Sequence, residues 1–497
     1  MIIESIVPLF VAIPLAGAFL IALLKRIKGI PDTLGVLASA SAFALSIMFV
    51  LKMEMGQRVI CNVGNWGGFQ EVLGRIVGIQ LVVDGFTVFM LVTVNLIAFL
   101  VAVYSMSYMT RYTEKWQFYS LFLLMLAGMN GVLITGDMFN LFVFVEIASL
   151  ASYALVAFGT GKKELEASFK YAVMGGVASL LILMGVIFLY SNTGTLNMED
   201  MARILGSSEN PVLIYLVFAL FLAGFGLKAA IFPFHAWLPD AHPSAPAPIS
   251  AMLSGVLIKA LGVYTLVRVF YCVFSFPEKV SSVFMTLGAL SMIIAVILAL
   301  KQWDMKRLLA YHSISQIGYI ILGFGIGSPL GILGGLLHLF NHSIFKSLLF
   351  LDAGSLEYAT GTRNLKEMGG LSKRMPVTSW TTLAASMSIA GVPPFAGFWS
   401  KLIIILACIQ MGLWFYAIIA VLASILTLAS FMKVTRYAFL GEIRNKLRNV
   451  LEVPAPMLIP MIILAIICII GGVLLIPGVR QGFLGLAIEA LSRARGV

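Results

Sequence analysis

Long apolar runs recur along almost the whole chain and indicate its class. Runs of about 18 or more apolar residues, bounded by charge or by glycine and proline, occur roughly fourteen times. A run of this length crosses a bilayer as a helix, where every backbone polar group must be paired internally. The pattern predicts an all-α integral membrane protein with about fourteen transmembrane helices. We expect them near residues 5–24, 33–51, 82–106, 117–134, 137–158, 168–190, 211–232, 248–273, 280–300, 308–326, 330–351, 376–404, 412–435 and 456–476.

The composition excludes a water-soluble enzyme. Only 11% of the 497 residues are charged, against about 25% in soluble proteins. No polar stretch exceeds about 30 residues, which is too short for an independent domain. The four cysteines, Cys61, Cys272, Cys408 and Cys468, are far apart and form no CxxC or Cys/His spacing. We therefore expect no metal, no flavin, haem, iron–sulfur or nucleotide cofactor, no redox chemistry within this chain, and no nucleic-acid partner.

The distribution of lysine and arginine predicts the orientation. If the N-terminus lies outside, the inward loops hold twenty of the 33 basic residues and the outward segments hold eight. Basic residues collect in cytoplasmic loops. We therefore expect a multi-pass protein of the cell membrane, or of an equivalent energy-coupling inner membrane, with both termini outside.

Five basic residues remain inside the predicted spans: Lys228, Lys259, Arg268, Lys346 and Lys401. A charge at mid-membrane costs about 2.5 to 3.5 kcal/mol on insertion scales, so such residues mark functional sites by default. Arg268 lies close enough to a helix end for its guanidinium to reach the interface, and we expect a structural role for it. The four lysines predict an ion pathway.

Two spans are interrupted. The helix at 211–232 carries Lys228 and breaks at Pro233, and the span at 376–404 is interrupted by Gly391, Pro393, Pro394 and Gly397, with Lys401 following. Proline removes a backbone N–H and leaves carbonyl groups free to face a polar cavity. The interruptions lie five spans apart, so the two helices run in opposite directions, as in inverted-topology repeats. We expect two inverted five-helix repeats with discontinuous helices 7 and 12.

This plan divides the chain into four parts. Residues 1–107 form three N-terminal helices, with an outward loop at 52–81 that we expect to fold as a small hairpin or cap. The first repeat spans 117–273, the second spans 280–435, and 436–497 holds a basic loop, the last helix and a tail. Asp84 and Asp137, at span ends, are expected to cap helices.

Glu146 lies near the middle of the fifth span and needs a cationic partner, because an unpaired carboxylate there would be protonated or destabilising. Lys228 is the obvious candidate. Burial disfavours the charged form of a lysine and pairing favours it, so this contact could decide whether Lys228 keeps its proton. The pair is predicted to act as a switch, with a static salt bridge as the alternative.

The span at 330–351 carries His338, His342 and Lys346 at i, i+4 and i+8, which places them on one helix face. Histidine can take up a proton on one ring nitrogen and release one from the other near neutral pH. Two histidines beside a lysine inside a span predict a proton relay. A metal site is disfavoured, because the nearby sequence offers no carboxylate or thiol as a third ligand.

His235, Asp240 and His242 lie beyond the first interruption, near the inner surface. They could form an entrance for protons. They could equally cap the short helix that follows Pro233, and both interpretations stay open.

Four motifs carry a family likeness. The chain resembles the antiporter-like membrane subunits of respiratory complex I, of Mrp-type Na⁺/H⁺ antiporters and of membrane-bound hydrogenases, and it looks most like the D subunit of Mrp antiporters and its counterpart in archaeal hydrogenase-type complexes. The likeness covers essentially the whole chain. The motifs are GDMFNLFVFVEIASLASYAL, LKAAIFPFHAWLPDAHPSAPAPISAMLSGVLIKALGVY, HLFNHSIFKSLLFLDAGSL and GVPPFAGFWSKL.

The resemblance implies fourteen transmembrane helices in two inverted five-helix units and a hydrophilic axis in the plane of the membrane. It also implies a set of proton-transfer residues, matched position by position. They are Glu146, Lys228, Lys259, His338, His342 and Lys401.

We therefore expect a proton-translocating subunit of a multi-subunit energy-converting complex, related to hydrogenases or NADH dehydrogenases. Its partners would be other membrane subunits, including sister antiporter-like or small Mrp-type subunits, and the lipid bilayer. The first alternative is a D-type subunit of an Mrp Na⁺/H⁺ antiporter without redox chemistry. An inert scaffold and a carrier of small organic solutes are weaker alternatives. Sodium is less favoured than the proton as the ion, because cationic nitrogens dominate the axis.

The expected proton route has an entrance, a relay and an exit. Protons would enter near His235 and His242, charge Lys228 or Lys259, and leave by Lys401. Four further residues complete the route, two in the relay and two in secondary positions: His338, His342, Asp240 and Lys346.

Overall fold

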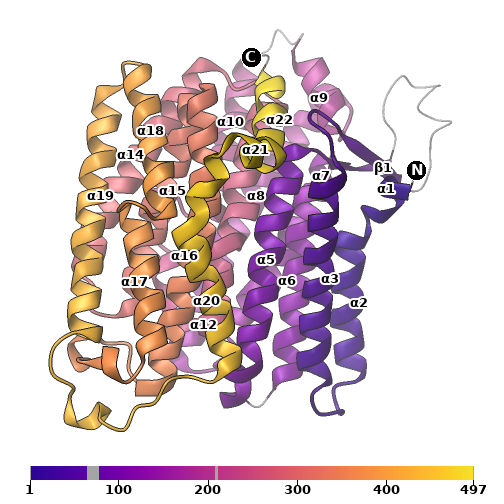
Figure 1. Ribbon diagram of the computed structural model, residues 1–497. Coiled ribbons are helices and arrows are strands. Elements are labelled where there is room, and N and C mark those ends of the chain that lie inside the picture. The colour runs from indigo at the N-terminus through magenta and orange to yellow at the C-terminus, as the bar shows by residue number, and fades with distance from the viewer. Residues whose placement is uncertain (1, 64–77, 113, 207–210, 496–497) are drawn as a thin grey trace.

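The computed structural model describes residues 2–63, 78–112, 114–206 and 211–495. Within these residues, twelve helical segments are long and apolar enough to cross a membrane. This confirms the predicted all-helical membrane protein (Figure 1). The twelve comprise α1 (Ile2–Ile6) with α2 (Leu9–Leu23), α3 (Ile30–Lys52), α5 (Gly85–Tyr108), α6 (Lys115–Ile134), α7 (Met138–Val156), α8 (Lys162–Thr193), α10 (Pro211–Ala229), α12 (Ala247–Met252) with α13 (Thr265–Cys272), α14 (Glu278–Leu300), α15 (Met305–Ile326), α19 (Trp414–Val434) and α20 (Ala455–Ile470).

Two predicted spans do not form a single apolar helix of spanning length. The span at 330–351 is part of α16 (Pro329–Thr360), which carries polar side chains along its length. The span at 376–404 is divided between α17 (Pro376–Ala390) and α18 (Ala396–Gln410), each of 15 residues. Polar content in the first case and the interruption in the second account for the difference from fourteen.

Both helix interruptions occur where the sequence predicts them. Helix α10 ends at Ala229, whose successor Ala230 has a φ of 55°, and the short helix α11 (Leu238–Ser244) begins after a run of turns. Helix α17 ends at Ala390, whose successor Gly391 has a φ of 81°, and α18 begins at Ala396. A left-handed residue at each end stops the helix and exposes its last carbonyl groups.

A small hairpin marks one end of the helix bundle. Strands β1 (Val59–Val63) and β2 (Ile79–Val83) pair antiparallel, which confirms the expected hairpin; its connection, 64–77, lies outside the described residues. Helices α9 (Met198–Leu205), α21 (Pro477–Arg480) and α22 (Leu486–Arg495) lie at the same end (Figure 1). We call this end the hairpin face. The opposite end, which carries the loops at 24–29, 301–304, 361–375 and 440–454, is the basic face.

Helix α16 forms the centre of the bundle. Every residue from 331 to 356 is buried, and the helix contacts α12, α15, α17, α18 and α20. Helix α12 and the π-helical turns that follow it are also buried throughout. By contrast, α8 and α19 expose apolar side chains along one face. Polar side chains on α16 are therefore surrounded by protein and shielded from lipid.

Candidate functional site

Glu146 and Lys228 meet between α7 and α10. The Oε1 atom of Glu146 lies 3.7 Å from Nζ of Lys228, and the lysine donates a shorter hydrogen bond of 2.8 Å to Oγ of Ser149. Ser179 donates a hydrogen bond to the same carboxylate from α8. The lysine side chain is 3% exposed and the glutamate 28%. The charged pair is therefore loose, and each member has a hydroxyl partner of its own.

Lys228 occupies the last turn of α10, directly before the interruption. A Cβ on Gly262 would lie only 2.4 Å from Cα of the next residue, Ala229, so the two backbones touch there. Gly262 belongs to the π-helical turn Lys259–Tyr264. This close approach brings the backbone segments that carry Lys228 and Lys259 together.

Lys259 is fully buried, and its ammonium donates to the carbonyl oxygen of Ser254. The helix around it is π-helical over Leu253–Leu257 and again over Lys259–Tyr264. Such turns are rare and occur often at functional sites, because they free carbonyl groups from the regular ladder. No apolar-run pattern predicts them. The Ser254 hydroxyl lies 2.7 Å from that of Ser313 on α15.

The two histidines and the lysine predicted to share a face of α16 are all fully buried. The rings of His338 and His342 have centroids 6.3 Å apart. Lys346 donates to the carbonyl oxygen of Leu309 on α15. His342 and Lys346 lie one helical turn apart on α16, and the ring of His342 packs on Phe345.

Lys401 is placed at the second interruption. Its ammonium donates to the carbonyl oxygen of Ile389 at 2.7 Å and lies 3.3 Å from Oγ of Ser424. These contacts use a carbonyl group that the end of α17 leaves free. Ser400, the preceding residue, lies 2.9 Å from Nδ1 of His338. The histidine pair on α16 is therefore hydrogen-bonded to α18 at the residue next to Lys401.

We call the buried residues Lys259, His338, His342, Lys346 and Lys401 the buried axis. Polar atoms without a hydrogen-bond partner in the described part of the chain occur on two of its histidines and on other buried side chains. Among the described residues, several fully buried side chains have polar atoms without a hydrogen-bond partner. Buried polar groups in proteins are almost always paired with protein or with ordered water, so these positions are expected to bind water. The atoms are His242 Nδ1 and Nε2, His312 Nδ1, Gln316 Nε2 and Oε1, His338 Nε2, His342 Nδ1 and Nε2, Asp352 Oδ2 and Ser386 Oγ.

The three residues beyond the first interruption do not form one cluster. Asp240 makes exposed ion pairs with Lys170 at 3.2 Å and Arg307 at 3.7 Å. His235 is partly buried and its ring packs on Phe232. Only His242 is fully buried, and its ring packs on Phe350 of α16. Among these three residues, only His242 therefore adjoins the buried axis.

Sequence reasoning missed an ion pair that links this axis to the basic face. Lys306, 2% exposed, lies 3.0 Å from Oε2 of Glu357, which is 26% exposed. Lys306 also donates to the carbonyl oxygen of Ala245, close to His242. The lysine resembles an ordinary loop residue in the sequence. The glutamate falls past the predicted end of its span because α16 continues to Thr360.

His312 and Gln316 were also missed. Both are fully buried on α15, and Nε2 of His312 lies 2.8 Å from Oγ of Ser430 on α19. Their i, i+4 spacing inside a predicted span was the available signal. The ring of His312 also packs on Phe431 of α19.

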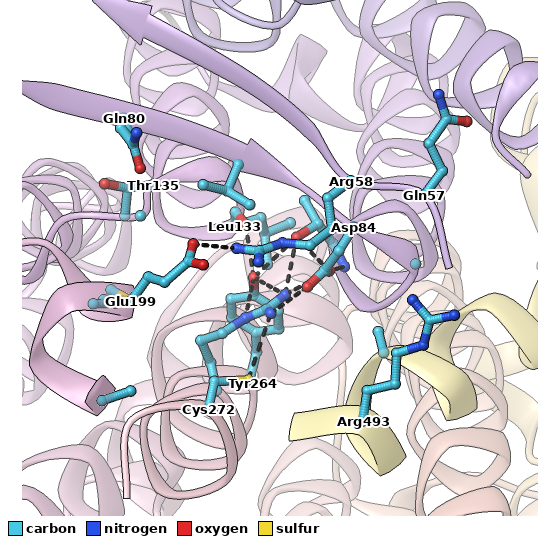
Figure 2. Close-up of a pocket in the computed structure, with 18 of the residues that line it drawn as sticks. Gln57, Arg58, Gln80, Asp84, Leu133, Thr135, Glu199, Tyr264, Cys272 and Arg493 are labelled. Atoms are coloured by element: carbon cyan, nitrogen blue, oxygen red, sulfur yellow. Dashed lines mark hydrogen bonds and ion pairs between the residues drawn. The ribbon is translucent and has the colours of Figure 1, made fainter. Parts of the chain in front are cut away.

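At the hairpin face, Arg268 forms an ion pair with Asp84, which lines a pocket there (Figure 2). Its Nη2 lies 2.8 Å from Oδ1 of Asp84, and its Nη1 lies 2.5 Å from the other carboxylate oxygen. Asp84 accepts from the backbone N–H of Thr87 and so caps α5, as expected. Asp137 caps α7 in the same way, accepting from Asn140.

Comparisons with known proteins agree on the class of molecule. Residues 135–427 match a family described as NADH:quinone oxidoreductase/Mrp antiporter, and residues 75–119 match the N-terminus of chain 5 of NADH-ubiquinone oxidoreductase (complex I). The chain is 35% identical to the D subunit of the Na⁺/H⁺ antiporter of Alkalihalophilus pseudofirmus over 94% of each chain. It is 36% identical to the N subunit of the NADH-quinone oxidoreductase of Desulforudis audaxviator, over 92% of this chain and 93% of that one.

Solved structures show the same fold. A chain of the Mrp complex from a Dietzia species superposes with a TM-score of 0.90 at 29% identity, covering 100% of this chain and 98% of that one. A chain of the membrane-bound sulfane sulfur reductase, an archaeal respiratory membrane complex, gives 0.87 at 31% identity, covering 99% and 98%. Both are structures of multi-subunit membrane complexes.

Proposed function

Because this chain belongs to the NADH:quinone oxidoreductase/Mrp antiporter family of membrane subunits, we propose that it is the proton-translocating, antiporter-like subunit of a larger energy-converting membrane complex. Driving energy comes from partner subunits, through redox chemistry or through an opposing ion gradient. Sister antiporter-like or small Mrp-type subunits flank it in the membrane.

One observation carries the proposal. Buried lysines and histidines lie on the central helix α16 and on segments that pack against it, and the unpaired ring atoms of the histidines call for bound water. Intramembrane ionisable residues are costly and mark ion pathways. A lysine that keeps or loses its proton according to nearby charge, next to histidines, can pass protons between such groups.

The proposed route begins at the basic face. Protons enter by the Glu357–Lys306 pair and His242, and reach Lys259 and Lys346. They continue through the histidines of α16 to Ser400 and Lys401. The Glu146–Lys228 contact acts as the switch that sets whether the lysine is charged, and its looseness supports this role over that of a rigid strut.

The topology that we propose has fourteen spans. It counts α16 as one span and the α17–α18 pair as another, with helices 4 to 8 and 9 to 13 as inverted five-helix repeats. The basic face lies on the cytoplasmic side and both termini outside, following the excess of lysine and arginine in the loops of the basic face.

Substitution of the switch tests the function. The intact complex is purified with its partners, reconstituted into liposomes, and assayed for ion translocation with a pH-sensitive dye. Glu146→Gln keeps the shape and removes the charge, and we expect translocation to fall at least about tenfold. The control is Glu166→Gln, which removes an exposed carboxylate of α8, and it should retain at least about half of the activity. Full activity of the Glu146→Gln complex would refute the proposal.

A D-type subunit of an Mrp Na⁺/H⁺ antiporter is the second candidate, favoured by the 35% identity and the TM-score of 0.90 to Mrp proteins. The subunits that co-purify with the chain separate the two functions. Iron–sulfur or hydrogenase-like partners indicate redox drive. Small membrane subunits alone, with proton movement that depends on a sodium gradient, indicate exchange.

A further inference from the structure

Three aromatic side chains join Lys228 to the segment that follows the first interruption. They are Tyr153 on α7, Tyr171 on α8 and Trp237, directly before α11. The rings of Tyr153 and Tyr171 meet edge to face, with centroids 4.5 Å apart. The rings of Tyr171 and Trp237 are stacked, with centroids 4.2 Å apart and an angle of 5° between their planes. We call these three residues the aromatic stack.

The aromatic stack is held by hydrogen bonds along its length. Trp237 donates from its indole Nε1 to the carbonyl oxygen of Leu227 at 3.0 Å. That carbonyl belongs to the last turn of α10, where the regular helical ladder ends. Ser152 donates to the hydroxyl group of Tyr171 at 3.0 Å. All three aromatic side chains are buried, and both ring contacts have geometries that aromatic pairs prefer. The stack therefore joins α7, α8 and the segment before α11 as one support.

Tyr153 occupies the end of the aromatic stack that faces Lys228. Its hydroxyl oxygen lies 3.4 Å from Nζ of the lysine. A Cβ on Gly175 of α8 would lie 1.9 Å from the same hydroxyl oxygen, so only a glycine leaves room for the tip of this tyrosine. The carbonyl oxygen of Tyr153 also accepts a hydrogen bond from Ser168 of α8 at 2.8 Å. Contacts with α8 therefore fix the hydroxyl group of Tyr153 independently of Lys228.

The ammonium of Lys228 lies closer to neutral hydroxyl groups than to its charged partner. Its distance to Oγ of Ser149 is 2.8 Å and that to the hydroxyl of Tyr153 is 3.4 Å, whereas Oε1 of Glu146 is 3.7 Å away. Direct ammonium–carboxylate hydrogen bonds are shorter, at about 2.7 to 2.9 Å. Opposite charges attract, so the ammonium would move towards the carboxylate unless other contacts held it.

Few charged groups compete for this ammonium. Within the described residues, Glu146 is the only ion-pair partner of Lys228. Lys259, on the π-helical turn packed against the end of α10, directs its ammonium to the carbonyl oxygen of Ser254. From α8, the side chain that reaches the pair is the neutral Ser179, which donates to the carboxylate. The position of the Lys228 ammonium is thus decided between Glu146 and the two hydroxyl groups.

We propose that Tyr153 is a positioning residue for Lys228: its hydroxyl group, supported by Tyr171 and Trp237, holds the ammonium away from Glu146. The inference rests on the proposed function and deepens it, because it names what keeps the Glu146–Lys228 switch open. Trp237 directly precedes α11, the helix that carries His242. The switch and the entrance therefore share one support.

Removal of one hydroxyl group tests the assignment. Tyr153→Phe keeps the ring and its packing on Tyr171. The intact complex is reconstituted into liposomes, and translocation is measured as a function of pH with the pH-sensitive dye. Without the hydroxyl the ammonium moves towards Glu146, and a closer carboxylate favours the charged form of a lysine. We expect the acid limb of the profile, where the lysine must release its proton, to shift upward by at least about 0.5 pH unit.

A second measurement follows the contact without using activity. A membrane-permeant carbodiimide modifies carboxyl groups in their protonated form, and the modified peptide that contains Glu146 is quantified by mass spectrometry. Closer pairing with the ammonium keeps Glu146 ionised, so Tyr153→Phe should slow its modification at least about twofold.

Two comparisons provide the controls. Tyr271 is also fully buried, and its hydroxyl group donates to the carbonyl oxygen of Phe324, so Tyr271→Phe removes a similar group and should keep the wild-type profile. Trp237→Leu removes the ring that stacks on Tyr171 and should shift the profile in the same direction as Tyr153→Phe. Trp237→Phe restores a ring at this position and should shift it less.

Two results would overturn the assignment. One is a Tyr153→Phe complex with the wild-type pH profile and the wild-type rate of modification at Glu146. The other is an equal loss of translocation at every pH with an unchanged rate of modification, which would show that Tyr153 only packs. If translocation is lost altogether, the rate of modification decides. Either result leaves the proposed function standing as long as Glu146→Gln strongly lowers translocation, so the two failures are distinguishable.

Discussion

The carboxylate of Glu146 and the ammonium of Lys228 lie 3.7 Å apart, whereas the same ammonium donates to Ser149 at 2.8 Å. A buried pair that only locks two helices is expected at hydrogen-bonding distance with every lone pair satisfied. Here the lysine has a neutral hydroxyl partner when the carboxylate moves away. That alternative partner is what a reversible contact requires.

Substitution of Lys228 distinguishes a reversible switch from a static salt bridge. Lys228→Met removes the titrating group and keeps most of the volume, and we expect translocation to fall at least about tenfold. Removal of one partner of a buried ion pair is destabilising, but the Glu146 side chain is 28% exposed and keeps the hydrogen bond from Ser179, so we expect only a small fall in the melting temperature. Translocation and thermal unfolding are measured on the same preparation. A large fall in melting temperature with translocation retained would indicate a static salt bridge.

The basic-face entrance predicts unequal roles for two neighbouring carboxylates. Glu357→Gln removes the group that pairs with buried Lys306, and we expect slower translocation, with the largest deficit at high pH, where proton supply is limiting. Glu367→Gln is the matched control on the same face. Hydrogen bonds from Thr362 and Asn364 lower the pKa of Glu367, and its side chain lies in solvent. Equal pH profiles for the two variants would contradict the entrance.

The histidine relay predicts that the hydroxyl group between α16 and α18 matters. Ser400→Ala removes the contact of 2.9 Å to His338 and leaves the helix intact. We expect translocation to fall by about threefold to tenfold, since one bridging hydrogen bond is lost and a water molecule can partly replace it. Ser424→Ala, which removes a side contact of Lys401, should have a smaller effect. The comparison is made by dye assay in liposomes. The reverse order would place the route through Ser424.

Removal of the carboxylate of Asp84 should destabilise the hairpin face. Burial alone would raise the pKa of Asp84, but the charge and hydrogen bonds of Arg268, with those of Thr87, lower it to about 2. Asp84→Asn keeps the helix cap and leaves a buried guanidinium unpaired, at a cost of about 2 to 4 kcal/mol. Asp137→Asn, a cap without an arginine partner, should cost less than about 1 kcal/mol. Thermal unfolding of the complex measures both.

The same pair sets a pH dependence. A carboxyl whose folded pKa is depressed stabilises the protein above its unfolded pKa, near 3.9, and the contribution is lost as the pH falls towards 2. The melting temperature should therefore decline through this range. The Asp84→Asn complex should lack this part of the decline. An identical decline in both proteins would show that other carboxyl groups cause it.

The contact between Ala229 and Gly262 predicts a packing defect. Gly262→Ala places a methyl group 2.4 Å from backbone atoms of Ala229, so the helices must separate, and we expect a loss of about 1 to 3 kcal/mol. Gly176→Ala, on α8, meets no atom within 4 Å and should be neutral or stabilising by up to about 1 kcal/mol. Melting temperatures measure both. Equal values for the two variants would contradict the close approach.

Much of the fold was predictable because membrane helices leave a local signal. Apolar runs, the interruptions at Pro233 and at Gly391, and the hairpin near Val59 all follow from hydropathy and from proline and glycine chemistry along a short stretch of chain. The number of single spanning helices does not follow in the same way, since α16 carries many polar residues. The apolar run predicts a span at 330–351, but only the structure shows that this run belongs to a helix of 32 residues with polar side chains along its length.

The lysines and His338 could be identified from the sequence because ionisable residues are costly inside membrane spans. Which residues they meet was decided by the tertiary structure. Lys306 and Glu357 form an ion pair only because the start of α15 and the end of α16 lie together. Asp240 pairs with Lys170 and Arg307 although it shares a motif with the buried His242. Local chemistry determines that an ionisable group is buried in the membrane. Its partner depends on the packing of helices that are distant in sequence, and no local pattern encodes that packing.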